Sequence, residues 1–163
     1  MEKVYLGFKL NHKTFGIDAK NVLRVSQIVE ITSVPQASES IMGIINVMGE
    51  VVPVVDLRKR LDLPAKPFAL TDYIIIVQTD TQAVSFVVDE IIGLIPAFDD
   101  KDVSLKNIIR NSPVIERVIK EDDEFILIID SRKLLNEQES EQIQTMVETQ
   151  NGAIYRAFSK ATA

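Results

Sequence analysis

The sequence predicts a mainly β protein, built from small barrels or a sandwich, and three observations support this prediction. Ten short runs rich in Val, Ile, Phe and Tyr follow one another between residues 5 and 130. Polar residues at 11–13 and 79–82 join neighbouring runs, as the loops of β-hairpins do. An internal repeat divides the chain into two related halves.

We expect strands at residues 5–10, 14–18, 22–31, 44–45, 51–55, 73–78, 83–88, 91–96, 115–120 and 125–129. Pro53 lies inside one of these runs and has no amide hydrogen, so its strand is expected at a sheet edge or at a bulge. Apolar residues then recur at helical spacing, which predicts a packing helix from residue 131 to about 150. Asn151-Gly152 would stop it, and the remaining tail forms a second short helix or is disordered.

The repeat aligns residues 50–61 with residues 124–135, 74 positions later, and five of those twelve residues are identical. Residues 15–18 align with residues 86–89, 71 positions later. Within the repeat, Asp56 and Asp130 each stand between a strand and a basic turn, where a carboxylate accepts from the free N–H groups of a helix start. Each half is too small to bury much core alone, so the two must pack together.

Composition excludes several classes of function. The 163 residues carry a net charge of -6, which is unsuited to binding nucleic acid through its phosphates. The absence of cysteine excludes thiol nucleophiles, thiolate metal sites and disulfides. The longest apolar runs span five residues and the start of the chain has no leader pattern, so we expect a cytoplasmic protein without direct membrane contact.

The sequence offers no catalytic apparatus. The one histidine, His12, falls in a predicted hairpin loop, and the six glycines form no phosphate-binding loop. Acidic clusters at residues 99–102 and 121–124 lack the glycine-punctuated calcium pattern. We therefore expect a binding or scaffolding module that is not an enzyme and has no cofactor or metal.

Residues 41–58 closely resemble the signature of the CheW family of chemotaxis coupling proteins. Residues 15–18, 87–89 and 125–135, which include Asp130, extend the resemblance over residues 5–135. The positions that match the signature are Gly43, Asn46, Gly49, Pro53, Asp56, Leu57 and Arg58.

The resemblance implies two five-stranded SH3-like barrels around a shared core, with short helices and a C-terminal helix. Residues 1–136 would form this domain, in two intertwined halves of roughly residues 15–80 and 81–136 plus the N-terminal strand, and residues 137–163 a helical or partly disordered tail. The implied function is that of an adaptor recruited to membrane-bound arrays. It would couple the cytoplasmic tips of methyl-accepting chemoreceptors to the regulatory domain of the histidine kinase CheA.

Matching the family position by position implies a receptor-binding groove lined by five residues. They are Val22, Arg24, Met48, Ile91 and Leu94. Gly43 would lie near the edge that faces the kinase. An ordinary core position is the alternative interpretation for the aliphatic residues. Because the family usually has arginine at Met48, and many members have glutamate at Arg24, we expect a divergent, pathway-specific coupling protein.

Two other functions are compatible with the same fold. The chain could be a CheW-like regulatory domain of a larger signalling protein, such as a kinase or a receiver fusion, and further domains beyond Ala163 would favour this. It could also be a small-molecule-binding barrel, although small five-stranded barrels are normally filled by their own side chains.

Overall fold

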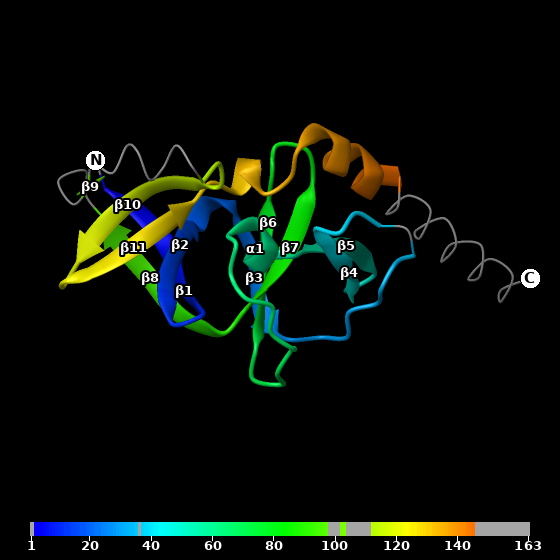
Figure 1. Cartoon of the computed structure of the whole chain (residues 1–163), viewed down its shortest axis with the longest axis horizontal. Helices are drawn as coiled ribbons and strands as arrows, with labels where there is room; N and C mark the ends of the chain where they lie inside the picture. Colours follow the sequence, from blue (N-terminus) through cyan, green and yellow to red (C-terminus); the bar gives the residue numbers. More distant parts are fainter. Residues whose placement is uncertain (1, 36, 98–101, 104–111, 146–163) are drawn as a thin grey trace, which may run out of the picture.

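The computed structural model describes residues 2–35, 37–97, 102–103 and 112–145, and it consists of two β-sheets joined side by side (Figure 1). The first strands are β1 (Lys3–Leu10), β2 (Lys13–Asp18), β3 (Val22–Gln27), β4 (Ile41–Val47) and β5 (Glu50–Val55). The later strands are β6 (Tyr73–Gln78), β7 (Ala83–Val88), β8 (Glu90–Ala97), β9 (Asp102–Val103), β10 (Ile115–Glu121) and β11 (Glu124–Ile129). The short helices are η1 (Ala19–Asn21), α1 (Leu57–Arg60) and η3 (Ser131–Lys133), followed by a helix at residues 137–145. The mainly β class is confirmed, and each of the ten predicted runs overlaps one strand.

The chain crosses between the two sheets at two short connections. One sheet has the order β8-β1-β2-β11-β10-β9, and the other has the order β3-β6-β7-β5-β4. The three-residue η1 carries the chain from β2 into the second sheet, and Asp89 alone separates β7 from β8 on the way back. Sheet membership therefore divides the chain at these crossings. The predicted halves of 15–80 and 81–136 assign β2 and β7 to the wrong sheets.

The two halves of the repeat make equivalent pairings. The aligned segments form parallel pairs, β2 with β11 in one sheet and β5 with β7 in the other. The predicted helix caps are confirmed, because Asp56 accepts from the Lys59 amide at 3.1 Å and Asp130 from the Arg132 amide at 3.0 Å. The repeat in the sequence is thus a repeat in the backbone.

Both sheets curl until their edges meet. After β3, Thr32 exchanges two backbone hydrogen bonds with Ile44 of β4, at the opposite edge of that sheet. In the other sheet, β9 follows β8 and pairs with β10 at the opposite edge. Val103 of β9 lies 71 positions after Thr32, so the two closures are equivalent in the repeat. The predicted strand at residues 22–31 is too long, because β3 ends at Gln27, opposite the first residue of β6. The last bond in this register is the one that the Ile28 amide donates to the carbonyl of Asp72, and beyond it the chain turns toward β4.

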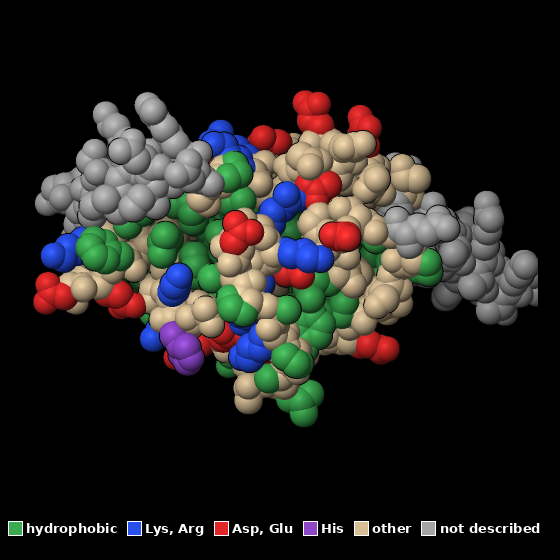
Figure 2. All heavy atoms as spheres, viewed as in Figure 1, with side chains coloured by type: hydrophobic (Ala, Val, Ile, Leu, Met, Phe, Trp, Pro, Cys, Tyr) green, Lys and Arg blue, Asp and Glu red, His purple; other side chains and the backbone are tan. Residues whose placement is uncertain are grey.

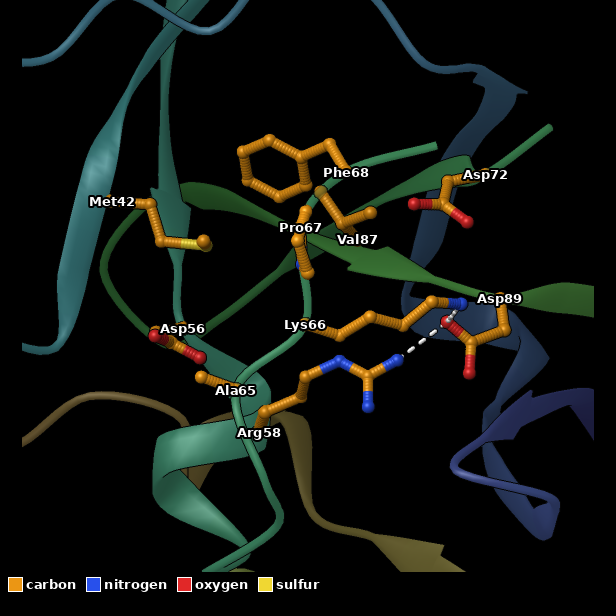
Figure 3. A pocket seen from close by; sticks show the side chains of 10 residues that line it. All are labelled: Met42, Asp56, Arg58, Ala65, Lys66, Pro67, Phe68, Asp72, Val87 and Asp89. Atoms are coloured by element: carbon orange, nitrogen blue, oxygen red, sulfur yellow. Dashed lines mark hydrogen bonds and ion pairs between the residues drawn. The ribbon is translucent and has the colours of Figure 1, made fainter. Parts of the chain in front are cut away.

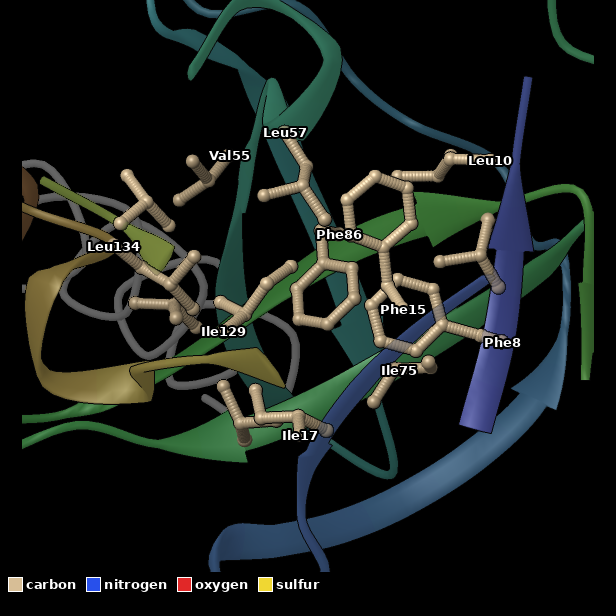
Figure 4. Packing of buried hydrophobic residues seen from close by; sticks show 14 of the residues in the cluster. Phe8, Leu10, Phe15, Ile17, Val55, Leu57, Ile75, Phe86, Ile129 and Leu134 are labelled. Carbon is tan, nitrogen blue, oxygen red and sulfur yellow. The ribbon is translucent and has the colours of Figure 1, made fainter. Parts of the chain in front are cut away.

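A shared core lies between the sheets, and Phe8, Phe15 and Phe86 are at its centre (Figure 4). The ring of Phe8 stacks on Phe15 at 5.9 Å and meets Phe86 of the other sheet at 5.5 Å. Separate clusters of buried side chains fill the inside of each curled sheet. Aromatic packing of this kind adds to the free energy gained by burying apolar area.

The prediction for Pro53 is wrong. The strand β5 lies inside its sheet, between β7 and β4, and the nearby bulge falls at Met42 of β4 instead. Proline is tolerated here because β5 and β7 share a single partner pair, Val54 with Ser85. The Ser85 hydroxyl donates to the Pro53 carbonyl at 2.9 Å and so satisfies that buried acceptor.

The C-terminal helix starts later than predicted. The η3 turn ends at Lys133, and the helix at residues 137–145 has its own capping box. The Glu139 amide donates to the Asn136 side chain at 2.7 Å, and the Asn136 amide donates to the Glu139 carboxylate at 3.1 Å. Ile143 is fully buried in the shared core, so packing extends beyond the expected boundary at residue 136. The rest of the predicted helix, its stop at Asn151-Gly152 and the tail lie outside the described residues.

Replacing Ile143 tests whether this helix belongs to the folded unit. We expect Ile143→Ala to lower the free energy of unfolding by about 2–5 kcal/mol, the usual cost of a cavity at a fully buried site. Urea denaturation measures the change, with exposed Gln142→Ala as the control. A loss below about 0.5 kcal/mol, as expected for surface substitutions, would mean that the helix is dispensable.

Candidate partner-binding surfaces

The strands β3 and β8 carry four of the exposed apolar side chains, and each lies at the edge of its sheet. Both strands contain a bulge, where Leu23 and Ile92 have no partner in the ladder. Leu23 is 57% exposed and Leu94 is 68% exposed, whereas Val22 and Ile91 pack against the shared core. A bulge turns side chains away from the regular alternation, which explains the apolar surface beside a core position. Sequence reasoning missed Leu23 and Ile92, because strand periodicity does not reveal bulges.

The two departures from the family pattern, Arg24 and Met48, touch each other. The guanidinium of Arg24 lies 3.0 Å from the Met48 sulfur, although β3 and the β4–β5 turn occupy opposite edges of their sheet. The sulfur is only a weak acceptor, so this contact cannot replace an ion pair. Met48 is 86% exposed. Its apolar side chain is therefore available to a partner.

Met48 also has an unfavourable backbone conformation for its residue type. Met48 and Gly49 form a two-residue hairpin turn in which both have positive φ, 52° and 88°. Asn and Gly favour such positions, whereas other L-residues lose roughly 1 kcal/mol or more in the left-handed region. The Gly49 amide donates to the Asn46 side chain at 3.0 Å and helps to hold the turn. The turn alone gives no reason for methionine at this position.

Position 43 must be glycine because the backbone of Thr32 passes very close to it. A Cβ atom at this position would lie 2.3 Å from the carbonyl oxygen of Thr32, the residue that joins the two edges of the sheet. Any side chain would push these edges apart. Gly43 therefore has a structural role, beside the one expected at the kinase-facing edge.

Asp89, in the connection between β7 and β8, joins three segments, and Figure 3 shows two of its partners, Arg58 and Lys66. It accepts from the Asn11 amide at 2.9 Å, from Arg58 at 2.5 Å and from Lys66 at 3.2 Å. Burial by itself raises the pKa of Asp89, but these donors outweigh it and bring the pKa below its ordinary value. The adjoining cavity is only about 70 Å³, so we interpret this cluster as a structural junction.

The described residues contain neither a candidate metal-binding cluster nor a candidate membrane-spanning helix. No group of acidic, His or Cys side chains among them could hold a metal ion. The acidic residues 121–124 form the β10–β11 hairpin turn, the predicted cluster at 99–102 falls largely outside the described part, and His12 is exposed in the β1–β2 turn. None of the helices in the described part is long and apolar enough to cross a bilayer.

Comparison with known proteins identifies the family. The family model of the CheW-like domain matches residues 4–139. This chain belongs to the CheW-like domain family. The chemotaxis protein CheW of Bacillus subtilis (strain 168) is 31% identical over 136 residues, covering 82% of this chain and 87% of that protein. The chemotaxis protein CheW of Thermotoga maritima is 26% identical over 133 residues, covering 81% and 87%.

Solved structures agree with this assignment. The scaffolding protein TtCheW from Thermoanaerobacter tengcongensis superposes with a TM-score of 0.76 at 30% identity, covering 85% of this chain and 91% of that one. The CheW fold and the two SH3-like barrels expected from the sequence are thereby confirmed.

Acid should weaken the Asp89 junction. Because the pKa of Asp89 is lowered in the folded state, its contribution to stability is complete above the ordinary pKa of 3.8 and is lost as the pH falls through the folded value. We therefore expect the unfolding free energy of Asp89→Asn to fall less than that of the wild type between about pH 5 and pH 2. Urea denaturation across this range measures the difference, with Asp62→Asn as the control. Parallel pH profiles for the wild type and Asp89→Asn would contradict the assignment.

Proposed function

We propose that this chain is a non-enzymatic adaptor of chemotaxis-type signalling. It would couple the cytoplasmic tips of methyl-accepting chemoreceptors to the regulatory domain of the histidine kinase CheA. The observation that carries the proposal is the family match over residues 4–139, together with relatives named chemotaxis proteins and a solved relative named a scaffolding protein. In this role the protein is cytoplasmic and is recruited to receptor arrays at the membrane.

The receptor-binding surface in this proposal comprises the exposed parts of β3 and β8 and the β4–β5 turn. Leu94 offers a largely exposed aliphatic side chain, and Val22 and Ile91 connect the surface to the shared core. A receptor helix that presents apolar residues at i, i+3, i+4 and i+7 suits such a surface. Arg24 and Met48 lie at its end, where charge and shape select the partner.

The Arg24–Met48 contact supports specialisation for one pathway. The family usually has arginine at the second position and often glutamate at the first, a combination that can form an ion pair. Here the same two positions hold one guanidinium and one thioether, and the methionine keeps a left-handed backbone conformation that its residue type disfavours. Strain that is kept at an exposed turn favours a functional reason for that side chain. We propose that Met48 makes an apolar contact with a dedicated receptor.

Titration against the kinase tests the adaptor function. Calorimetry of this chain with the regulatory domain of CheA from the same organism should give a dissociation constant in the micromolar range or tighter. A negative heat-capacity change should accompany binding, since apolar surface is buried. The absence of detectable binding would mean that the fold is kept while the partner has changed.

Restoring the family residues tests the specialisation. We expect Met48→Arg to weaken binding of a receptor-tip fragment from the same organism by about tenfold, because the apolar contact is lost and two guanidinium groups meet. The double variant Arg24→Glu with Met48→Arg removes that repulsion and should still bind more weakly than the wild type. Phe125→Asp, at another exposed apolar side chain, is the matched control. Unchanged or tighter binding by Met48→Arg would argue against specialisation.

A further inference from the structure

A hollow of about 540 Å³ lies between the two basic turns of the repeat, α1 and η3. Its charged lining residues are four cations, Lys59, Arg60, Arg132 and Lys133, and one carboxylate, that of Glu39, and we call it the basic hollow. Lys and Arg side chains lie close to carboxylates near the centre of the face seen in Figure 2, over α1. None of these residues belongs to the surfaces assigned to the receptor or the kinase.

The repeat explains why cations gather at this place. Lys59 and Lys133 are equivalent residues, 74 positions apart, and each follows the cap of its own short helix by three residues. The packing of the two halves brings both lysines to one hollow. The four cations face three carboxylates, those of Glu39, Asp130 and Glu139, so the hollow keeps a small positive excess in a chain of net charge -6.

Internal ion pairs hold the two arginines. Arg60 binds the carboxylate of Glu139, and Arg132 binds Asp130 at 3.0 Å while its side chain stays 62% exposed. The donors of Asp130 outweigh the effect of its burial and keep its pKa below the ordinary value. These ion pairs hold the two arginine side chains in the walls of the hollow and neutralise their charge. The positive charge that is left for a ligand therefore comes from the lysines.

The two lysines remain available to a ligand. The Lys59 ammonium donates to the carbonyl of Glu39 at 3.1 Å and lies 4.0 Å from the carboxylate of that residue, which is 94% exposed. Among the described residues, no hydrogen bond or ion pair engages the Lys133 ammonium. A ligand carboxylate could therefore displace Glu39 and pair with both ammonium groups.

We propose that the basic hollow binds an acidic peptide segment of a protein partner. Its carboxylates would pair with Lys59 and Lys133, and one of its backbone carbonyls would accept from the side-chain NH2 of Asn136, whose oxygen already caps the helix. The cations are spread around a hollow with an apolar base that includes Val114 and Leu135, which suits an extended segment better than one compact anion. The site would give the adaptor a contact separate from its receptor and kinase surfaces.

Fluorescence anisotropy of a fluorescein-labelled hexaglutamate peptide, at low ionic strength, tests this proposal with the full chain. We expect binding to weaken by about fivefold or more in the double variant Lys59→Gln with Lys133→Gln. The matched control, Lys20→Gln with Lys120→Gln, removes the same charge from two other exposed lysines. This control should change the dissociation constant less than twofold, which corresponds to about 0.4 kcal/mol or less.

Three results would overturn the proposal. The first is an equal loss in both double variants, because this would indicate attraction by overall charge. The second is no binding by the wild type, or equal binding of a labelled hexaglutamine peptide. The third is displacement by inorganic phosphate at the concentration of the peptide, which would indicate a small-anion site. None of these measurements involves the receptor or the kinase, so the adaptor function is tested separately.

Discussion

The fold depends on the two short connections at which the chain crosses between its sheets. Across the three residues of η1 the chain passes from β2 in one sheet to β3 in the other. Across the single residue Asp89 it passes back, from β7 to β8. Each sheet then takes two strands from one half of the repeat and three or more from the other. Neither half can complete a barrel alone, so the shared core forms together with both barrels. Because each sheet contains strands from both halves, Phe8 and Phe86 meet across this core.

The repeat conserves backbone functions and lets the exposed side chains differ. Both halves have an aspartate-capped turn, a parallel strand pair and an extension that closes the sheet. At equivalent hairpin tips, however, one half carries Met48-Gly49 and the other Asp122-Asp123, all with positive φ. An apolar tip beside Arg24 and an acidic tip thus stand on the same backbone. Different partners can be recognised by equivalent parts of one scaffold.

Sequence reasoning located the strands but missed several boundaries, for reasons specific to each place. The strand from Val22 ends early because its partner β6 begins at Tyr73, and the Ile28 amide makes the last bond in that register, to the carbonyl of Asp72. Pro53 fits inside a sheet because β5 and β7 share a single partner pair, Val54 with Ser85, so the missing amide hydrogen of Pro53 interrupts no regular ladder on that side. The capping box of Asn136 and Glu139 lies in the sequence six residues after the cap at Asp130, and the helix begins at this second signal and not at the first. At the candidate site, the sequence indicated the receptor-binding residues, such as Arg24 and Met48, but not which residues they contact in the folded protein.

The sequence by itself determined what depends on neighbouring residues. Strand periodicity, the caps at Asp56 and Asp130, the repeat and the family signature all arise within short segments, where local backbone preferences act. Only the tertiary structure decided which half supplies each strand, that Arg24 touches Met48, and that Lys59 and Lys133 line one hollow. These contacts join residues up to 74 positions apart. They follow from how the two halves pack around the shared core, which no local pattern encodes.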